Sequence, residues 1–163
     1  VARRHMMLDE IEHAGRFGLR DVVGAFLRPV AEKLNDPDGG RDFIRINAQL
    51  VALHTVHVHN VGPSPLKLPA NDRLMVFLGR ALAGQAVPAA VLRQRSMLAA
   101  MLLFHGLADH LRMLELASAK DDSMNTDSFL HTLEEAIVAI LQGPARPDGM
   151  EKTKRDKGEL HGR

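Results

Sequence analysis

The stretch from Met97 to Ala108 limits the possible folds of this chain more than any other feature, because His105 is its only polar residue. A helix that covers one side of a domain needs a single apolar stripe, whereas a helix that is apolar all round is buried on every side. We predict that this stretch belongs to one long helix between Pro88 and Ala117. In a chain of 163 residues, a single helix seldom finds partners for all its faces within its own chain. The pattern therefore predicts an all-helical domain that forms a dimer.

Two stripes on this predicted helix differ in kind. One stripe is mostly large and suits a domain core: Met97, Met101, Phe104, Ala108 and Leu111. The other includes small and polar residues, which suits the close approach of a second helix: Ala99, Leu103, Gly106, His110 and Met113. The final helix carries an apolar stripe of its own, so the two could form half of a four-helix bundle that a second copy completes. The predicted dimer interface comprises Ala99, Leu103, Gly106, His110, Leu130, Leu133, Ile137 and Leu141. The alternative is a central helix in a monomeric bundle.

The other patterned segments of the chain also have the periodicity of helices. The predicted helices cover residues 2–14, 19–34, 41–59, about 74–82 and about 126–142. Pro29 predicts a kink in the second of these. Asn71 or Asp72 is the predicted cap of the fourth, and Thr126 or Asp127 that of the last. We therefore predict an all-α bundle of about six helices, with residues 1–142 as one folded domain. Residues 143–163 are polar and without periodicity, which predicts a flexible tail.

The overall composition argues against several classes of function. A formal net charge of +1 gives no general attraction to nucleic acid or to a membrane surface. The absence of Cys excludes disulfides, thiolate metal sites and a cysteine nucleophile. The longest apolar run is far shorter than the roughly 20 residues of a membrane-spanning helix, and no signal-peptide pattern begins the chain. These observations predict a cytoplasmic protein with no membrane partner.

The nine histidines raise the question of a metal or catalytic site. His54, His57 and His59 cluster in the sequence, but on a helix only His54 and His57 share a face, and no nearby acid completes a ligand set. His105 and Asp109 stand four residues apart, where the carboxylate could orient the imidazole, yet no nucleophile accompanies them. We expect no catalytic residue, no metal and no cofactor. An enzyme that uses one of these two pairs is the alternative.

Four segments of the chain, in their order and spacing, carry a resemblance to a known family. These segments are Arg3–Glu12, Leu27–Leu34, Gly40–Ile46 and the run from Ala81 through Pro88 to Arg95. Over residues 1–142 the chain resembles the C-terminal ligand-binding and dimerisation domain of the tetracycline-repressor (TetR) family of bacterial transcriptional regulators. The resemblance implies a homodimer in which an effector changes the separation of two DNA-reading heads. Such an effector must bind one arrangement of the dimer better than the other.

The resemblance also implies a cavity among the middle helices for a small lipophilic effector. We expect it to be lined by Phe43, Asn47, Leu50, His54, Phe77, Met101 and His105, a largely apolar set with a few polar groups. The family reads DNA with an N-terminal helix-turn-helix, whereas this sequence begins Val1-Ala2-Arg3-Arg4 in helical periodicity. DNA binding is therefore expected only through a domain outside this sequence. The alternative is a stand-alone helical ligand-binding or scaffold module without DNA binding.

Overall fold

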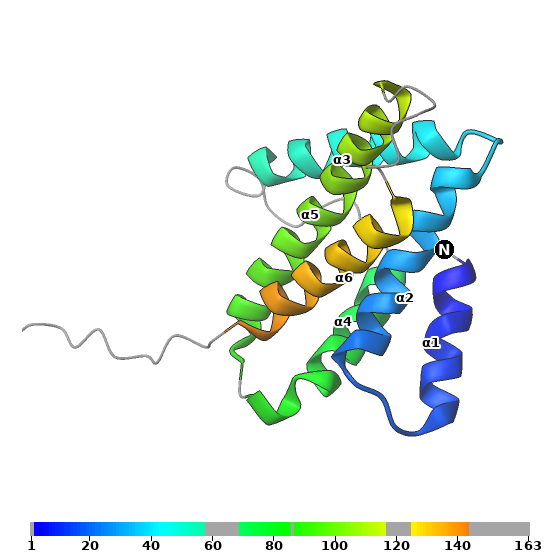
Figure 1. Ribbon diagram of the computed structural model, residues 1–163. Coiled ribbons are helices and arrows are strands. Elements are labelled where there is room, and N and C mark those ends of the chain that lie inside the picture. The colour runs from blue at the N-terminus through cyan, green and yellow to red at the C-terminus, as the bar shows by residue number, and fades with distance from the viewer. Residues whose placement is uncertain (1, 58–68, 86, 117–124, 144–163) are drawn as a thin grey trace, which may run out of the picture.

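The computed structural model describes residues 2–57, 69–85, 87–116 and 125–143, and all the regular secondary structure in these residues is helical (Figure 1). The six α-helices of this part of the chain are α1 (Ala2–Ala14), α2 (Leu19–Ala31), α3 (Gly40–His57), α4 (Pro69–Ala81), α5 (Ala89–Leu116) and α6 (Thr126–Gln142). Two short 3-10 helices, η1 (Glu32–Asn35) and η2 (Ala83–Gln85), follow α2 and α4. The prediction of an all-α bundle of about six helices is confirmed.

Helix α2 is the most thoroughly buried element of the described structure. It packs against α1, α4 and α6, and in Figure 1 it lies between α1 and α6. The apolar residues Leu19, Val22, Val23, Leu27 and Val30, which recur at helical spacing, are buried, and so are Gly24 and Ala25 beside them. Pro29 lies inside α2, and the α-helical geometry ends two residues later, where η1 begins. A proline lacks the N–H that would bond to the carbonyl four residues earlier, so the turn of α2 that precedes Pro29 lacks that hydrogen bond.

Close packing at the turn after η1 sets where α3 begins. Gly39 has φ +79°, a left-handed conformation that side chains rarely adopt. A Cβ on Gly40 would lie only 2.2 Å from the carbonyl oxygen of Lys33, so only glycine allows this approach of α3 to η1. The Asp36 carboxylate accepts hydrogen bonds from the Lys33 ammonium and the Asp38 N–H, which together lower the pKa of Asp36. The turn therefore holds α3 against the end of α2.

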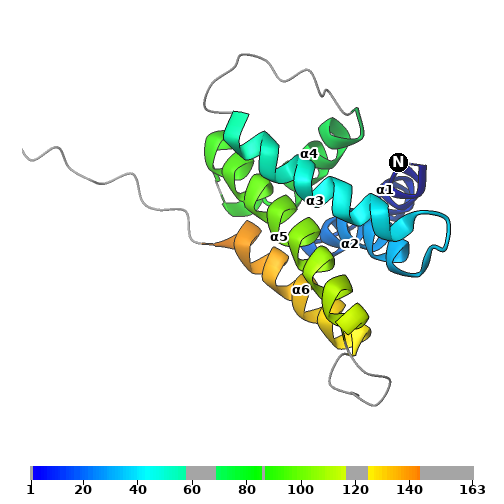
Figure 2. The same ribbon diagram turned by 90° about the horizontal axis from the view of Figure 1, so that it is seen from above.

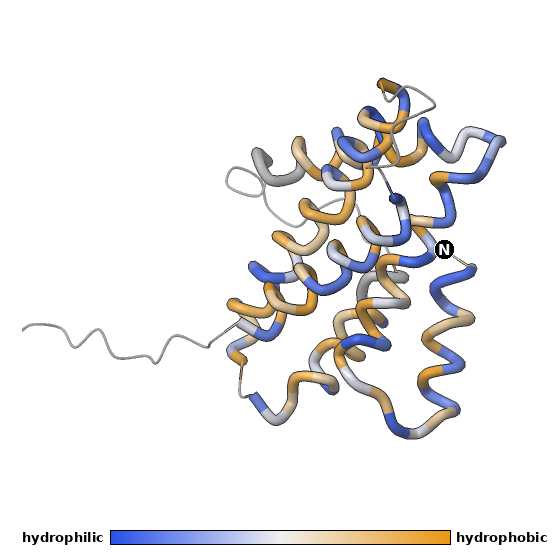
Figure 3. Tube along the Cα trace, viewed as in Figure 1, coloured by the Kyte–Doolittle hydropathy of each residue, from blue (hydrophilic) through white to orange (hydrophobic). Residues whose placement is uncertain are grey.

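Helix α5 is covered by α3 on one side and by α6 on another. Figure 2 shows α3 lying across α5, with α6 alongside α5. Helices α5 and α6 are antiparallel, because His110 late in α5 meets Thr126 early in α6, and Arg95 early in α5 donates to the carbonyl of Leu141 late in α6. Figure 3 shows hydrophobic residues along much of α5. Among the described helices, α5 is the one long and apolar enough to cross a membrane, a test that core helices of soluble proteins also pass.

Exposed ion pairs join helices at the surface of the bundle. Arg73 of α4 lies 2.6 Å from Asp9 and 2.9 Å from Glu12 of α1. Arg20 of α2 forms a two-bonded pair with Glu135 of α6, and this hydrogen bonding lowers the pKa of the Glu135 carboxyl. Ion pairs this exposed contribute little to stability, so the apolar contacts beneath them hold the helices together.

Two predicted helix caps differ from those observed. Helix α4 begins at Pro69, so Asn71 and Asp72 lie inside it rather than at its cap. Proline is favoured at the first helical position, where its missing N–H costs no hydrogen bond. Helix α6 is capped by Asn125, whose Oδ1 accepts a hydrogen bond from the Ser128 N–H at 3.1 Å, one residue before the predicted cap. The predicted tail lies outside the described residues beyond Gly143.

Candidate functional site

Most of the residues predicted to form the dimer interface lie inside the chain, between α5 and α6. Six of them are buried: Ala99, Leu103, His110, Leu133, Ile137 and Leu141. Gly106 and Leu130 are half-buried, and a Cβ on Gly106 would already lie 3.4 Å from Leu133 Cδ1. Within the single chain these six residues are covered already, and the helix that packs on the α5 stripe is α6 of the same chain. Small residues do indicate a close helix approach, but they do not distinguish a partner chain from the chain itself.

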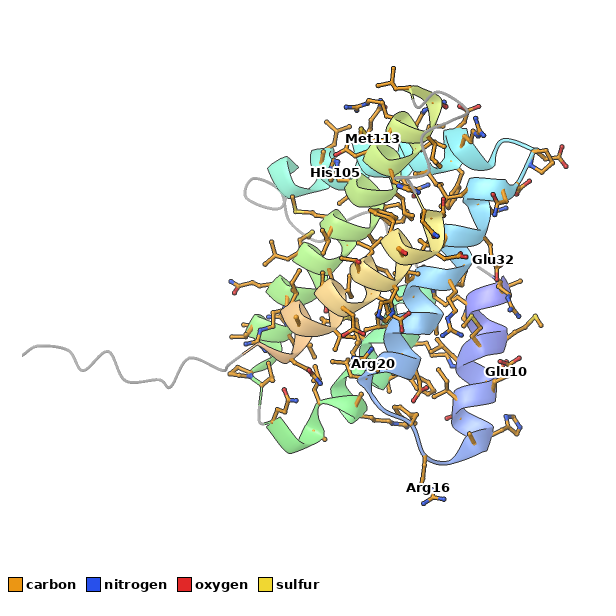
Figure 4. All side chains as sticks on the ribbon, viewed as in Figure 1. Glu10, Arg16, Arg20, Glu32, His105 and Met113 are labelled. Atoms are coloured by element: carbon orange, nitrogen blue, oxygen red, sulfur yellow. The ribbon has the colours of Figure 1, made fainter. Side chains whose placement is uncertain are left out.

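The opposite side of α5 is not covered by the described part of the chain. We define the open face of α5 by the residues that recur there at helical spacing: Leu98, Leu102, His105, Asp109, Met113 and Leu116. Leu98 and Met113 are each 52% exposed and Leu116 is 76% exposed, and Leu102 and His105 are half-buried. Figure 4 labels His105 and Met113 on the C-terminal half of α5. Apart from His105 and Asp109, the open face is apolar.

Helix α6 extends this apolar surface with half-buried residues of its own. Phe129, Ala136 and Ile140 are each partly exposed and stand seven and four residues apart, which places them on one side of α6. Phe129 lies against α5, with its ring centroid 4.1 Å from that of His110. The α5–α6 pair therefore presents partly exposed apolar side chains from both of its helices.

Phe77, one of the residues predicted to line an effector cavity, lies in the core of the bundle. Phe77 is only 2% exposed and packs against Phe17, with ring centroids 5.3 Å apart. The guanidinium groups of Arg73 and Arg80 each lie 5.6 Å from the centroid of the Phe77 ring. Phe77 is thus a core residue that joins α4 to the segment before α2. An apolar residue at helical spacing fits a core as well as a pocket, and the sequence pattern alone does not distinguish the two.

The other predicted cavity residues lie on α3 and α5. Phe43 and Leu50 are 41% and 48% exposed on the surface of α3. Asn47 donates a hydrogen bond from Nδ2 to the Phe43 carbonyl at 2.8 Å, so its amide is bonded to its own helix. Met101 and His105 are half-buried and one turn apart on α5. The side chain of His54 lies outside the described residues.

Helix α3 has two apolar faces, and only one of them is buried. Ile44 and Ala48 are covered at 0% and 5% exposure. The second face, which we term the α3 stripe, consists of Phe43, Ile46, Leu50 and Leu53, exposed by 41%, 54%, 48% and 57%. Its spacing of three, four and three residues is that of an apolar seam between helices. Sequence reasoning noticed Phe43 and Leu50 but missed Ile46 and Leu53, which the same spacing would have identified.

A polar surface cleft of about 620 Å³ lies where η1, the start of α3 and Glu115 of α5 meet. Glu115 accepts a hydrogen bond from Arg45 at 2.5 Å and lies 3.6 Å from Arg41. These charged groups and the Asp36 turn line the cleft, so its walls do not suit the apolar effector that the sequence predicts. Sequence reasoning did not predict this cleft, because its walls come from segments far apart in the chain.

Of the residues considered for metal binding or acid–base chemistry, the structure describes the side chains of His105 and Asp109. Within the described residues, no group of three or more His, Asp or Glu is placed to hold a metal ion. The side chains of His57 and His59 lie outside that part of the chain. The Asp109 carboxylate lies 3.5 Å from the Arg112 guanidinium on the exposed side of α5. Asp109 is therefore engaged by a cation of its own helix.

Comparisons of the chain with protein-family models, curated proteins and solved structures gave no match in any of the three. The fold class therefore follows from the structure, and the family resemblance depends on the four sequence segments that carry it.

Proposed function

We propose that this chain is the regulatory domain of a TetR-like transcriptional repressor, which dimerises through α5 and α6 and binds a small, mostly apolar effector. One observation carries the proposal. Between Met97 and Ala108, helix α5 is apolar around its circumference apart from His105, yet the described part of its own chain packs against α5 mainly from α3 and α6 and leaves Leu98, Met113 and Leu116 of the open face exposed. Apolar surface on one continuous face is typical of an interaction site.

A second copy of the chain is the partner that fits this surface best. The antiparallel α5–α6 pair is half of a four-helix bundle, and a two-fold axis would bring two such halves together. An isologous interface requires a patch that is complementary to itself. The apolar residues Leu98, Leu102 and Leu116 meet this requirement, and Asp109 and Arg112 could exchange partners across the axis. In this proposal the interface residues are those of the open face, in place of the buried stripe.

The effector is proposed to bind against the α3 stripe and the half-buried Met101 and His105 of α5. The stripe offers an apolar wall, methionine adapts to ligands of different shape, and the imidazole supplies a polar group for orientation. DNA contact is proposed to come from a helix-turn-helix outside this sequence, as in the family that the chain resembles. The protein would then act in the cytoplasm, without a membrane partner.

Sedimentation velocity on the purified chain tests the dimer on which this function depends. We expect the wild type to sediment as a dimer at micromolar concentration and Leu98→Glu to sediment as a folded monomer, because a charge in the interface would lose its hydration. Val76→Glu on α4 is the matched control, since Val76 and Leu98 are both 52% exposed. This control should remain dimeric. A monomeric wild type across the micromolar range would contradict the proposal.

A further inference from the structure

Among the buried residues that the structure describes, His110 is the one with a polar side chain, and 6% of its surface is exposed. Its ring is parallel to that of Phe129, with an angle of 3° and centroids 4.1 Å apart. Its Nε2 lies 3.0 Å from Oγ1 of Thr126, the first residue of α6. A single side chain on the C-terminal half of α5 thus contacts two residues of the first turn of α6.

The surroundings of His110 favour the neutral imidazole. Burial removes water from the ring and lowers the pKa of His110 below its usual value of 6.5. The first turn of a helix carries the positive end of the helix dipole, which also disfavours a cation at Thr126. Neither Phe129 nor Thr126 carries a negative charge that could pair with an imidazolium.

The charged groups on the neighbouring elements are exposed or already paired. On α5 the Asp109 carboxylate is exposed and faces Arg112, and on α6 Asp127 is exposed. From α3, Arg41 and Arg45 are engaged with Glu115. On α6, His131 is exposed, Glu135 is bonded to Arg20 of α2, and Glu134 interacts electrostatically with the same arginine. Among the described residues, a proton on His110 would therefore have no carboxylate partner.

We propose that His110 is a pH switch that holds the first turn of α6 against α5 while its imidazole is neutral and releases that turn when the imidazole is protonated. This inference uses only contacts within one chain, so it does not depend on the proposed dimer. If the chain does dimerise through α5 and α6, the switch would make the geometry of that interface sensitive to pH.

The direction of the pH dependence follows from the sign of the pKa change. The pKa of His110 is lower when the ring is buried than when it is free, so the released state binds the proton more readily. The stabilising effect of the contact is complete above the free value of 6.5 and is lost as the pH falls from 6.5 toward the lower, buried pKa. For one such group, the population of the released state rises by up to about tenfold between roughly pH 7.5 and 5.5.

Hydrogen–deuterium exchange of the full chain at these two pH values, corrected for intrinsic exchange rates, tests the switch. We expect the amides of residues 126–131 to lose up to about tenfold in protection at the lower pH, while those of α2 do not change. The variant His110→Phe keeps the stacked ring but cannot titrate, so its protection should not depend on pH. His131→Phe is the matched control, because it removes an exposed histidine from the same helix and should behave like the wild type.

Two outcomes would overturn the proposal. One is a wild type whose α6 protection does not change with pH, and the other is a His110→Phe variant that loses protection as the wild type does. Should His110→Phe fail to fold, an NMR titration of the His110 ring in the wild-type protein decides the question. A pKa clearly below 6.5 would support the switch, and a pKa at or above 6.5 would contradict it.

Discussion

Helices α2 and α5 are both rich in apolar residues, but they differ in how much of their surface the rest of the chain covers. Helix α2 has a polar side in sequence, with Arg20, Asp21 and Arg28, yet α1, α4 and α6 surround it closely enough to bury Gly24 and Ala25. Helix α5 has almost no polar side between Met97 and Ala108, yet it keeps an open face with Leu98 and Leu116 exposed. The position of a helix in the bundle therefore decides how much of its surface is covered. Apolar surface that the helix's own chain leaves exposed indicates a further partner.

The largest expected effect is on the free energy of unfolding, which truncation of a leucine should lower much more in α2 than in α5. Leu27 of α2 is 2% exposed, so Leu27→Ala should leave a cavity and lower the free energy of unfolding by about 2–5 kcal/mol. The same truncation at Leu98, which is 52% exposed in one chain, should change the stability of the monomeric state by no more than about 0.5 kcal/mol. Urea denaturation at low protein concentration measures both. Equal losses at the two positions would remove the distinction between the helices.

A smaller effect is expected on the inner side of α5, where it packs on α6. Gly106→Ala adds a methyl group that would lie 3.4 Å from Leu133 Cδ1 and 3.7 Å from Phe129 Cζ. Alanine in a helix interior is favoured over glycine by about 1 kcal/mol, and the crowding requires only a slight movement of Leu133. We expect the midpoint of thermal unfolding to rise slightly. A clear fall would show that the α5–α6 contact is tighter than these distances imply, and Gly84→Ala, with open space around Gly84, serves as the control.

The sequence predicted the helices well, because the pattern of apolar residues along the chain determines them locally. The first helix was predicted at residues 2–14 and is observed at Ala2–Ala14, and the long helix differs from its prediction by one residue at each end. The caps were less predictable, because Pro69 and Asn125 lie just outside the apolar patterns that were used to find α4 and α6.

The assignment of faces could not be predicted to the same extent. The sequence showed two stripes on α5. It did not show that the stripe with the smaller residues packs on α6 of the same chain, or that Phe77 lies in the core beside Phe17. Which stripe meets which helix depends on contacts between residues far apart in sequence, and helical periodicity carries no information about those pairings. His110 could be recognised in the sequence as the polar member of its stripe, whereas its stacking on Phe129 required the structure.

Cysteine cross-linking tests most directly whether the open face of α5 meets a second copy of itself. The chain contains no cysteine, so each single substitution introduces the only thiol. We would place cysteine at Leu98, Leu102 or Met113 on the open face and at Val76 on α4 as the control, and oxidise each protein at micromolar concentration. The account predicts a covalent dimer from at least one position of the open face and little from Val76→Cys. The absence of covalent dimer at all three positions, or equal cross-linking at Val76→Cys, would contradict it.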